Sequence, residues 1–168
     1  ELSRKEMELR LKESELYALQ AQIRPHFLYN VLNSLRGNLL EKGDVANGEI
    51  VGLLARMFRL LLRSRGPVVT LGEECELVGA YLRIQEYRFA GRLAYSLELP
   101  AELANFRIPS MSLQPIVENA VVHVTERVEG TTHIRVSAER DGELVRVAVR
   151  DNGPGIPAGR LAEIRRWL

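Results

Sequence analysis

How the second half of the chain folds is decided by residues 110–124, SMSLQPIVENAVVHV. Their apolar side chains recur at helical spacing and predict a helix that turns one stripe toward a core. We expect this stripe to comprise Leu113, Ile116, Val117, Ala120, Val121 and Val124. Glu118 and Asn119 lie opposite it, and His123 follows one turn beyond Asn119. A carboxylate beside a carboxamide offers the oxygen ligands that Mg²⁺ prefers, although such a pair on its own is more typical of a solvated polar face.

Two strands and a glycine-rich loop are predicted after this helix. THIRVSAE (132–139) and ELVRVAVR (143–150) alternate apolar and polar residues, and Asp141 with Gly142 is a strong hairpin signal between them. The loop DNGPGIP (151–157) places Asp151 at the end of the second strand, where its carboxylate can accept a hydrogen bond from an amino group such as that of adenine. Gly153 and Gly155 leave room for a close approach of the backbone. The same loop is compatible with a simple tight turn before the helix that GRLAEIRRWL begins.

On the N-terminal side of residue 110, a helix from about residue 72 to 89 precedes the strand RLAYSLEL (92–99). This strand presents Leu93, Tyr95, Leu97 and Leu99 on one face. The order helix, strand, helix, hairpin, loop, helix predicts an α+β sandwich with its helices on one face of a sheet.

The first part of the chain is predicted to be helical. Two amphipathic helices are separated by a turn at EKGDVANGE (41–49), and the linker RGPVVTLGEE (65–74) ends this helical hairpin. The second helix carries one apolar stripe, formed by Leu53, Leu54, Met57, Phe58, Leu61 and Leu62. Two such helices leave their core unfinished, so we expect a homodimer in which two hairpins form a four-helix bundle. Ahead of the hairpin, apolar residues at steps of seven indicate either a coiled-coil lead-in or a solvated helix with few apolar contacts: Leu2, Leu9, Leu16 and Ile23.

In the first helix, QIRPHFLYNVLNSL (22–35), a proline directly precedes a histidine. The apolar spacing continues through Pro25, which removes the backbone bond to the carbonyl of Ala21 and favours a kink, at a cost of ~3 kcal/mol in a helix interior. A helix that tolerates this kink is either bent around something or presenting something, and the residue presented would be His26. Asn30 and Asn33, four and seven residues further on, share its face.

Composition limits the classes of function. The 168 residues carry 23 basic and 22 acidic side chains, a net charge of +1, and the basic residues are scattered, so we expect no nucleic-acid partner. The single cysteine, Cys75, rules out an internal disulfide. No apolar run approaches the ~18 residues of a membrane span and no signal peptide opens the sequence, so we expect a soluble chain.

Three motifs together resemble those of one family. LQPIVENAVVH resembles the N box, and DNGPGIP the first glycine box, of the Bergerat ATPase superfamily, which includes gyrase, MutL and histidine kinases. LQAQIRPHFLYNVLNSL is similar to the phosphoacceptor segment of LytS-type sensor histidine kinases, and LGEECELVGAYLRIQEYRF looks like that family's bridge between its two halves. The resemblance covers residues from about 16 to 168. It implies a dimerisation and histidine-phosphotransfer domain with its lead-in over residues 1–66, and a partial Bergerat ATP-binding domain over residues 67–168.

The resemblance also implies a role for each motif residue. At the phosphotransfer step, the resemblance implies that His26 is the acceptor and that Glu118 activates or orients it. It also implies that Asn30 and Asn33 support the acceptor. At the ATP pocket, the resemblance implies that Asn119 is the Mg²⁺ ligand and that Asp151 accepts a hydrogen bond from adenine. The other implied pocket residues are His123, Gly153 and Gly155.

The function implied by the resemblance is autophosphorylation of His26 with ATP and Mg²⁺, followed by transfer to a response-regulator receiver domain in two-component signalling. The implied setting is a homodimeric, cytoplasmic portion of a bacterial inner-membrane protein, joined to the membrane only through N-terminal segments outside this sequence. Two rival interpretations stay open. One is a non-catalytic dimerisation and docking module with an incomplete nucleotide pocket, and the other is a gyrase-like hydrolytic ATPase, against which the helical hairpin argues.

The chain departs from the family pattern at three points. Many histidine kinases have an acidic residue directly after the phosphoacceptor histidine. This chain has Phe27 there, as in the LytS-type pattern, so the catalytic base is unassigned. Val124 stands where a glycine usually follows the N-box histidine. The lid and second glycine box, whose backbone amides hold phosphates, have no counterpart before Leu168, so we expect a C-terminally incomplete domain. His133, on the outward face of a predicted strand, receives no role.

Overall fold

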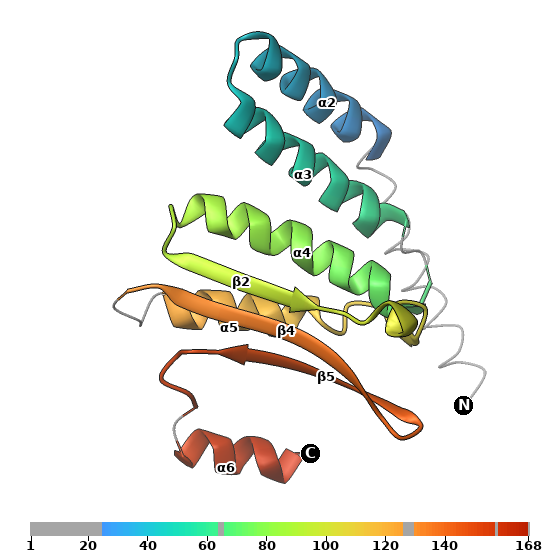
Figure 1. Cartoon of the computed structure of the whole chain (residues 1–168), viewed down its shortest axis with the longest axis vertical. Coiled ribbons are helices and arrows are strands. Elements are labelled where there is room, and N and C mark those ends of the chain that lie inside the picture. The colour runs from blue at the N-terminus through green and yellow to red at the C-terminus, as the bar shows by residue number, and fades with distance from the viewer. Residues whose placement is uncertain (1–24, 64–65, 126–129, 157, 168) are drawn as a thin grey trace, which may run out of the picture. The chain divides into compact units, whose positions relative to one another are not determined.

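The computed structural model describes residues 25–63, 66–125, 130–156 and 158–167. The chain divides into two compact units, Glu1–Leu62 and Arg63–Leu168 (Figure 1). The predicted domain boundary between residues 66 and 67 stays a prediction. The predicted coiled-coil lead-in and the carbonyl of Ala21, at which the kink was expected, lie outside the described residues.

The first unit is a helical hairpin of α2 (Pro25–Glu41) and α3 (Val45–Arg63). Gly43 has a φ of 76° and ends α2, with its N–H donating to the Leu40 carbonyl at 3.0 Å and the Asp44 N–H donating to Leu39 at 2.9 Å. This pair of bonds is a Schellman motif. Asp44 then opens α3, because its Oδ1 accepts the N–H of Asn47 at 3.3 Å. The predicted turn over residues 41–49 is therefore too long, since only residues 42–44 lie between the helices.

The two helices of the hairpin approach each other closely. A Cβ on Gly48 would come within 2.9 Å of Leu40 Cδ2, so a larger residue there would require Leu40 to move. Further along, the Arg59 guanidinium lies 5.7 Å from the centre of the Tyr29 ring. Among the described residues of this unit, Ala55 is the one hydrophobic side chain that is fully buried. The hairpin alone therefore has little core.

The second unit contains two sheets. In the first, β1 (Val68–Thr70) pairs antiparallel with β3 (Arg107–Pro109). In the second, the order is β2-β4-β5, in which β2 (Leu93–Glu98) is parallel and β5 (Leu144–Asp151) antiparallel to β4 (Thr132–Asp141). The helical elements are α4 (Leu71–Arg88), a 3-10 turn (Ala101–Leu103), α5 (Gln114–Thr125) and α6 (Ala158–Trp167). Within the described part of the chain, no helix is both long and apolar enough to cross a membrane.

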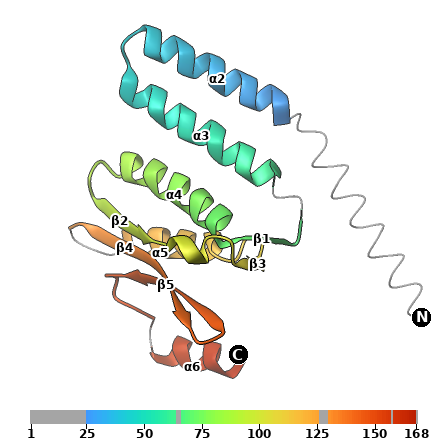
Figure 2. The same cartoon turned by 45° about the vertical axis from the view of Figure 1, so that its right-hand side comes forward.

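The three-stranded sheet has one face covered by helices and one open face. Ile134 and Val136 of β4 are buried and join one hydrophobic cluster with Leu82 of α4 and Val117 of α5. Their neighbours in the strand, such as Arg135, are exposed. Helices α4 and α5 therefore pack on the same face of the sheet (Figures 1 and 2). The predicted α+β class, with a helical hairpin followed by helices on one sheet face, is confirmed.

The prediction that residues 65–74 form a linker is wrong. It contains β1 and the first turn of α4. Thr70 joins the two through a capping box, in which its Oγ1 accepts the Glu73 N–H at 3.1 Å and Glu73 Oε2 accepts the Thr70 N–H at 2.8 Å. A capping box satisfies two backbone donors of the helix end, so the chain passes directly from strand to helix.

Two further boundaries differ from the prediction. Helix α5 begins at Gln114 rather than at residue 110, and Ile116, which was placed in the buried stripe, is 53% exposed. In the β4–β5 hairpin, Asp141 still pairs with Leu144, so the two turn residues are Gly142 and Glu143. Gly142 has a φ of 63°, which suits the first central position of a two-residue hairpin turn.

A buried carboxylate joins α4 to the start of α5. Glu74 is 4% exposed, and its two oxygens accept the N–H groups of Met111 at 2.7 Å and Leu113 at 2.9 Å. Met111 has a φ of 61°, a conformation that is uncommon outside glycine, and this hydrogen bond helps to hold it there. The Leu113 carbonyl accepts the N–H groups of Ile116 and Val117. Glu74 therefore holds the residue from which α5 starts, and its negative charge faces the positive end of the helix dipole.

We expect Glu74→Gln to lower the free energy of unfolding by about 1.5–3 kcal/mol, because one backbone N–H loses a charged acceptor and an amide donor takes that place. Glu86→Gln, on the same helix, is the matched control, since the Arg83–Glu86 ion pair is solvent-exposed and such pairs contribute less than about 1 kcal/mol. Denaturant unfolding measures both variants. Equal losses would mean that the Glu74 carboxylate does not hold the start of α5.

Candidate functional site

The loop after β5 is held against the C-terminal end of α5. Asp151 is the last residue of β5, and its Oδ1 accepts the N–H of Gly153 at 2.8 Å. A Cβ on Gly153 would lie 2.7 Å from Val124 Cγ2 and 2.8 Å from Asp151 Oδ1. Neither group leaves space for a side chain, so helix and loop meet at a point that only glycine allows. Gly155 differs, because its φ of 73° requires glycine while the space around it is open.

The Asp151 carboxylate lies on the helix-covered side of the sheet. Along β5, Val145, Val147 and Val149 pack against the core, and Asp151 continues this alternating series. Asp151 is exposed, and no described residue donates a hydrogen bond to its Oδ2. The site therefore offers one carboxylate oxygen fixed by the loop and a second that is open to an amino group.

One face of α5 points away from the core and carries both polar and apolar side chains. Asn119 and His123 are exposed there, one turn apart. Ile116 and Val122 are also about half exposed, at 53% and 48%. Ile156, from the loop, is 54% exposed. Apolar side chains interspersed with a few polar groups are typical of surfaces that bind an organic ligand.

Glu118 does not share the surroundings of Asn119. Gln114 Nε2 donates a hydrogen bond to Glu118 Oε1 at 2.7 Å, and Gln114 is only 7% exposed. Burial raises the pKa of Tyr81 on α4, and the nearby Glu118 carboxylate raises it further, while Arg88 lowers it. Glu118 is thus half-buried beside α4, whereas Asn119 points to solvent. The predicted pair of adjacent ligands is split between two environments.

Gln114 is a candidate functional residue that the sequence analysis missed. Its Oε1 is buried and accepts no hydrogen bond from a described residue. Its Nε2, in contrast, is committed to Glu118. The spacing of four residues on one helix face was the available signal, because residues at i and i+4 are neighbours.

The predicted phosphoacceptor group lies in the other unit. His26 is the second residue of α2, and its side chain is outside the described ones. Asn30 is exposed and Asn33 is half-buried on the same helix. The structure therefore brings Asp151, Gly153 and the end of α5 together in the second unit, and leaves His26, Asn30 and Asn33 in the first.

The predicted Mg²⁺ site is judged by the side chains that could act as its ligands. No group of three or more His, Cys, Asp or Glu side chains gathers around a common point in the described ranges. Mg²⁺ does not require such a group, because it is often held by one or two protein oxygens together with phosphates and waters. The exposed carboxamide of Asn119 fits the role of a single ligand. The half-buried, hydrogen-bonded Glu118 fits it less well.

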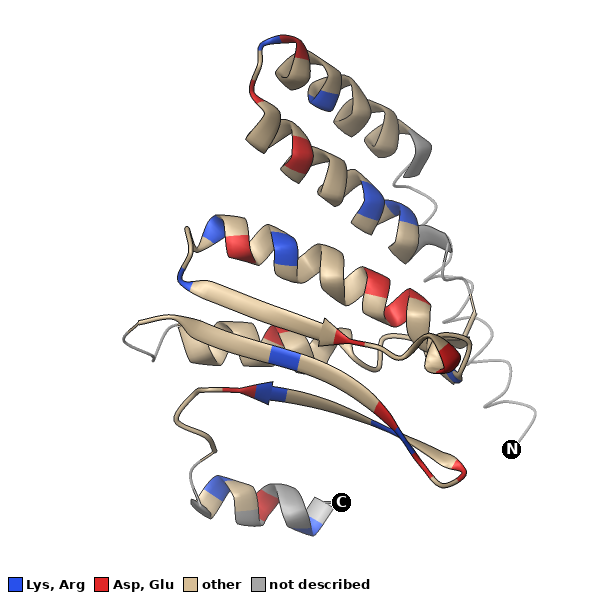
Figure 3. Ribbon diagram, in the orientation of Figure 1, with Lys and Arg blue, Asp and Glu red and all other residues tan. Residues whose placement is uncertain are grey.

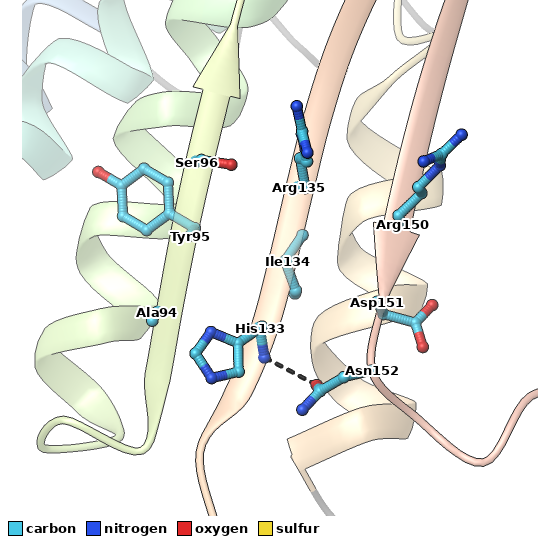
Figure 4. Close-up of a pocket in the computed structure, with 9 residues that line it drawn as sticks. All are labelled: Ala94, Tyr95, Ser96, His133, Ile134, Arg135, Arg150, Asp151 and Asn152. Carbon is cyan, nitrogen blue, oxygen red and sulfur yellow. Dashed lines mark hydrogen bonds between the residues drawn. The ribbon is translucent and has the colours of Figure 1, made fainter.

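Two hollows lie on the open face of the sheet, opposite the helices. The first has a volume of about 390 Å³, and Figure 4 shows the residues that line it, from β2, β4 and β5. The alternation of the strands directs Ser96, Arg135 and Arg150 to this side, away from the Asp151 carboxylate. Figure 3 shows Lys and Arg together with Asp and Glu on α4, on the β4–β5 hairpin and on α6. These hollows are therefore separate from the site at α5.

Two family models match the chain. Residues 14–93 match the histidine kinase model, and residues 110–166 match the model of histidine kinase-, DNA gyrase B- and HSP90-like ATPases. The first match contains His26 and α4, and the second contains α5 and the loop after β5.

Several sensor proteins are similar to nearly the whole chain. The sensor histidine kinase YesM of Bacillus subtilis (strain 168) is 39% identical over 160 residues, which is 94% of this chain and 27% of that protein. The sensor histidine kinase BtsS of Escherichia coli (strain K12) is 38% identical over 142 residues, 84% of this chain and 25% of that protein. The sensor protein LytS of Staphylococcus haemolyticus (strain JCSC1435) is 33% identical over 163 residues, 96% of this chain and 28% of that protein. The chain spans about a quarter of the length of these relatives.

The contact between Gly153 and Val124 predicts a coupled pair of substitutions. We expect Gly153→Ala to destabilise the second unit by about 1–3 kcal/mol, because the new Cβ overlaps Val124 and the Asp151 carboxylate. In a Val124→Ala background the same change should cost less, since part of the overlap is gone. Gly159→Ala, in α6 with open space around it, is the control and should be neutral or slightly stabilising. Thermal unfolding of the four-member cycle tests this, and strict additivity would contradict the contact.

Proposed function

The chain belongs to the LytS-type sensor histidine kinases, and we propose that it phosphorylates its own His26 with ATP and passes the phosphoryl group to an aspartate of a response-regulator receiver domain. The observation that carries this proposal is the presence in one chain of a histidine-bearing helical hairpin and an ATPase-type site built by α5 and the loop after β5. A non-catalytic docking module is less well supported, because both halves match catalytic families over 137 residues, 80 in the first match and 57 in the second.

In this proposal the loop after β5 binds the adenine end of ATP. Asp151 would accept a hydrogen bond from the exocyclic amine through the oxygen that the loop leaves open. Gly153 supports this because its lack of a side chain lets the loop lie against Val124. Ile156 would supply apolar surface for the ring, and Gly155 would allow the loop its bend. Adenine is thereby bound by one charged acceptor and apolar contacts.

The exposed face of α5 would hold the phosphate end. Asn119 is the residue proposed to ligate Mg²⁺, and His123, one turn further on, would lie near the phosphates. When bound, the metal ion neutralises charge on the phosphate oxygens during transfer. The protein's own contribution is the carboxamide oxygen of Asn119. This group is neutral, so it adds no negative charge next to the phosphates of ATP.

The acceptor step is assigned to His26, with Glu118 as its helper. A neutral imidazole is a good nucleophile near neutral pH, and it forms the new N–P bond as the bond from the γ-phosphorus to the β–γ bridging oxygen breaks and ADP leaves. Glu118 is held by Gln114 in a fixed orientation, which suits a group that accepts a hydrogen bond or proton from the imidazole. Asn30 and Asn33, on the helix of His26, would support the acceptor. His26 and Glu118 belong to different units, so the step requires the units to bring them together.

The proposed partners follow from the helical unit and from charge. A second copy of the chain would complete the helical hairpin, and the receiver domain would take the phosphoryl group. The net charge of +1 gives no reason to add nucleic acid. The proposed setting is the cytoplasmic part of a bacterial inner-membrane sensor.

The proposal is tested with two variants of the full-length protein and γ-labelled ATP. We expect His26→Gln to abolish acid-labile labelling while nucleotide binding stays nearly unchanged, because the acceptor is removed and the pocket is not. We expect Asp151→Asn to weaken adenine-nucleotide binding by about 1.5–3 kcal/mol, the value of a charge-assisted hydrogen bond, with His26 intact. Calorimetry measures binding, and label retention at high pH measures the phosphohistidine.

Each variant has an outcome that would refute its role. Labelling that persists in His26→Gln and maps to His123 or His133 would refute the assignment of the acceptor. Parent-like nucleotide affinity of Asp151→Asn would refute the adenine role without affecting the first result.

From the apolar stripe of the helical unit we expect a homodimer. Two substitutions in this stripe should dissociate it. Helix α3 carries Leu54 and Leu61 on a stripe that its hairpin only half buries. We expect Leu54→Glu with Leu61→Glu to convert a dimer into a monomer, because two charges would enter the predicted four-helix core. Val45→Glu, an exposed position on the other side of α3, is the control and should remain dimeric. Light scattering distinguishes the states, and a monomeric parent at high micromolar concentration would contradict the prediction.

A further inference from the structure

The open face of the three-stranded sheet carries two arginines directly opposite each other. Arg135 of β4 pairs in register with Arg150 of β5, and on its other side with Ser96 of β2. Like charges directly opposite one another on neighbouring strands are destabilising. Such a row persists more readily where an anion offsets the repulsion.

Only one of the two arginines is neutralised by the protein. Arg135 donates to Glu98 Oε2 at 2.6 Å, in a pair whose side chains are about half exposed. Arg150 forms no hydrogen bond or ion pair with any residue in the described ranges. The next arginine along the same face, Arg146, is paired with Glu139 and Asp141. Arg150 is therefore left without a counter-charge among the described residues, beside an Arg135 that Glu98 already pairs.

The row borders space on both sides. The hollow of about 390 Å³ includes Ala94, Ser96 and His133, whose small or planar side chains leave the floor open. A second hollow of about 520 Å³ lies beyond the same two arginines, over Ser137 and Ala148. Figure 4 shows Ser96, Arg135 and Arg150 side by side on the three strands. Volumes of 300–1,000 Å³ suit a small molecule.

The rim of the first hollow is fixed by Asn152. Its Oδ1 accepts the backbone N–H of His133 at 2.8 Å, and its Nδ2 donates to the Thr131 carbonyl at 3.0 Å. These two bonds tie the start of β4 to the end of β5. The imidazole of His133 makes no hydrogen bond to a described residue, so a ring N–H is available as a donor.

We propose that this face is a binding site for a small soluble anion, a phosphate or carboxylate compound, held by Arg150 and Arg135 with Ser96 and His133 as additional donors. An arginine fork binds either oxyanion through paired N–H groups, which a single lysine would not do. The site is distinct from the one proposed for ATP, because it lies on the opposite face of the sheet. The two sites lie back to back at Asp151. This residue of β5 borders the hollow on the open face, while its carboxylate points to the helix-covered face.

The test is an NMR titration of the ¹⁵N-labelled chain with inorganic phosphate, against sodium chloride at matched ionic strength. We expect saturable shifts of the backbone amides of Ser96, Arg135 and Arg150 with phosphate but not with chloride. Arg150→Gln should weaken this binding about tenfold or more, because a charge-assisted contact is lost. Arg146→Gln, on the same strand and face but already paired, is the matched control and should change the affinity less than about twofold. A parallel titration with acetate determines whether the site prefers phosphate or carboxylate.

Three results would overturn the proposal. Shifts that grow linearly and equally with phosphate and chloride would indicate general charge screening. Equal weakening by Arg150→Gln and Arg146→Gln would indicate attraction by net charge rather than a site. Saturable shifts confined to α5 and residues 151–156, and unchanged in Arg150→Gln, would place the phosphate at the proposed nucleotide site instead.

Discussion

The buried Glu74 carboxylate is the interaction on which the arrangement of the second unit depends. It accepts N–H groups from residues 37 and 39 positions further along the chain and so determines where α5 starts against α4. Each residue of an α-helix advances the side-chain direction by about 100°. A start displaced by one residue would therefore turn Asn119 toward the core and remove Val124 from Gly153. Burial, with a smaller contribution from the same carboxylate, also raises the pKa of the Cys75 thiol to about 11, so this thiol stays protonated at neutral pH.

Elements with a local signal were predicted well from the sequence. Helix α4, strand β2 and the β4–β5 hairpin lie within a residue or two of their predicted bounds, because each has enough residues to show its period. Strands β1 and β3 were missed, since three residues show no period and their pairing joins segments about 40 positions apart. The late start of α5 was missed for a related reason. The loop before it is held by Glu74 rather than by any turn signal of its own, and helical spacing alone extended the helix backward through it.

At the candidate site, residue types could be predicted and orientations could not. Asp151, Gly153 and Asn119 were proposed for the site because motif chemistry depends on which atoms a residue offers, and their roles stay predictions. That Glu118 turns toward Gln114 and Tyr81, while its neighbour Asn119 faces solvent, depends on how α5 rotates against α4. Val124 was noted only as a departure from the family pattern. Its contact with Gly153 explains why the loop tolerates that departure: the absence of a side chain on the loop offsets the larger side chain on the helix.

The end of β5 links the two faces of the sheet. Successive residues of a strand point to opposite sides, so Asp151 belongs to the helix-covered face while Arg150 and Asn152 belong to the open one. Asn152 is bonded to the backbone of Thr131, just before β4, and of His133 within it, and Asp151 is bonded to the loop that contacts α5. A shift of this short segment therefore changes both hydrogen-bond sets together. An anion bound to Arg150 and a nucleotide bound to Asp151 would act on the same three residues, which makes their affinities interdependent by linkage.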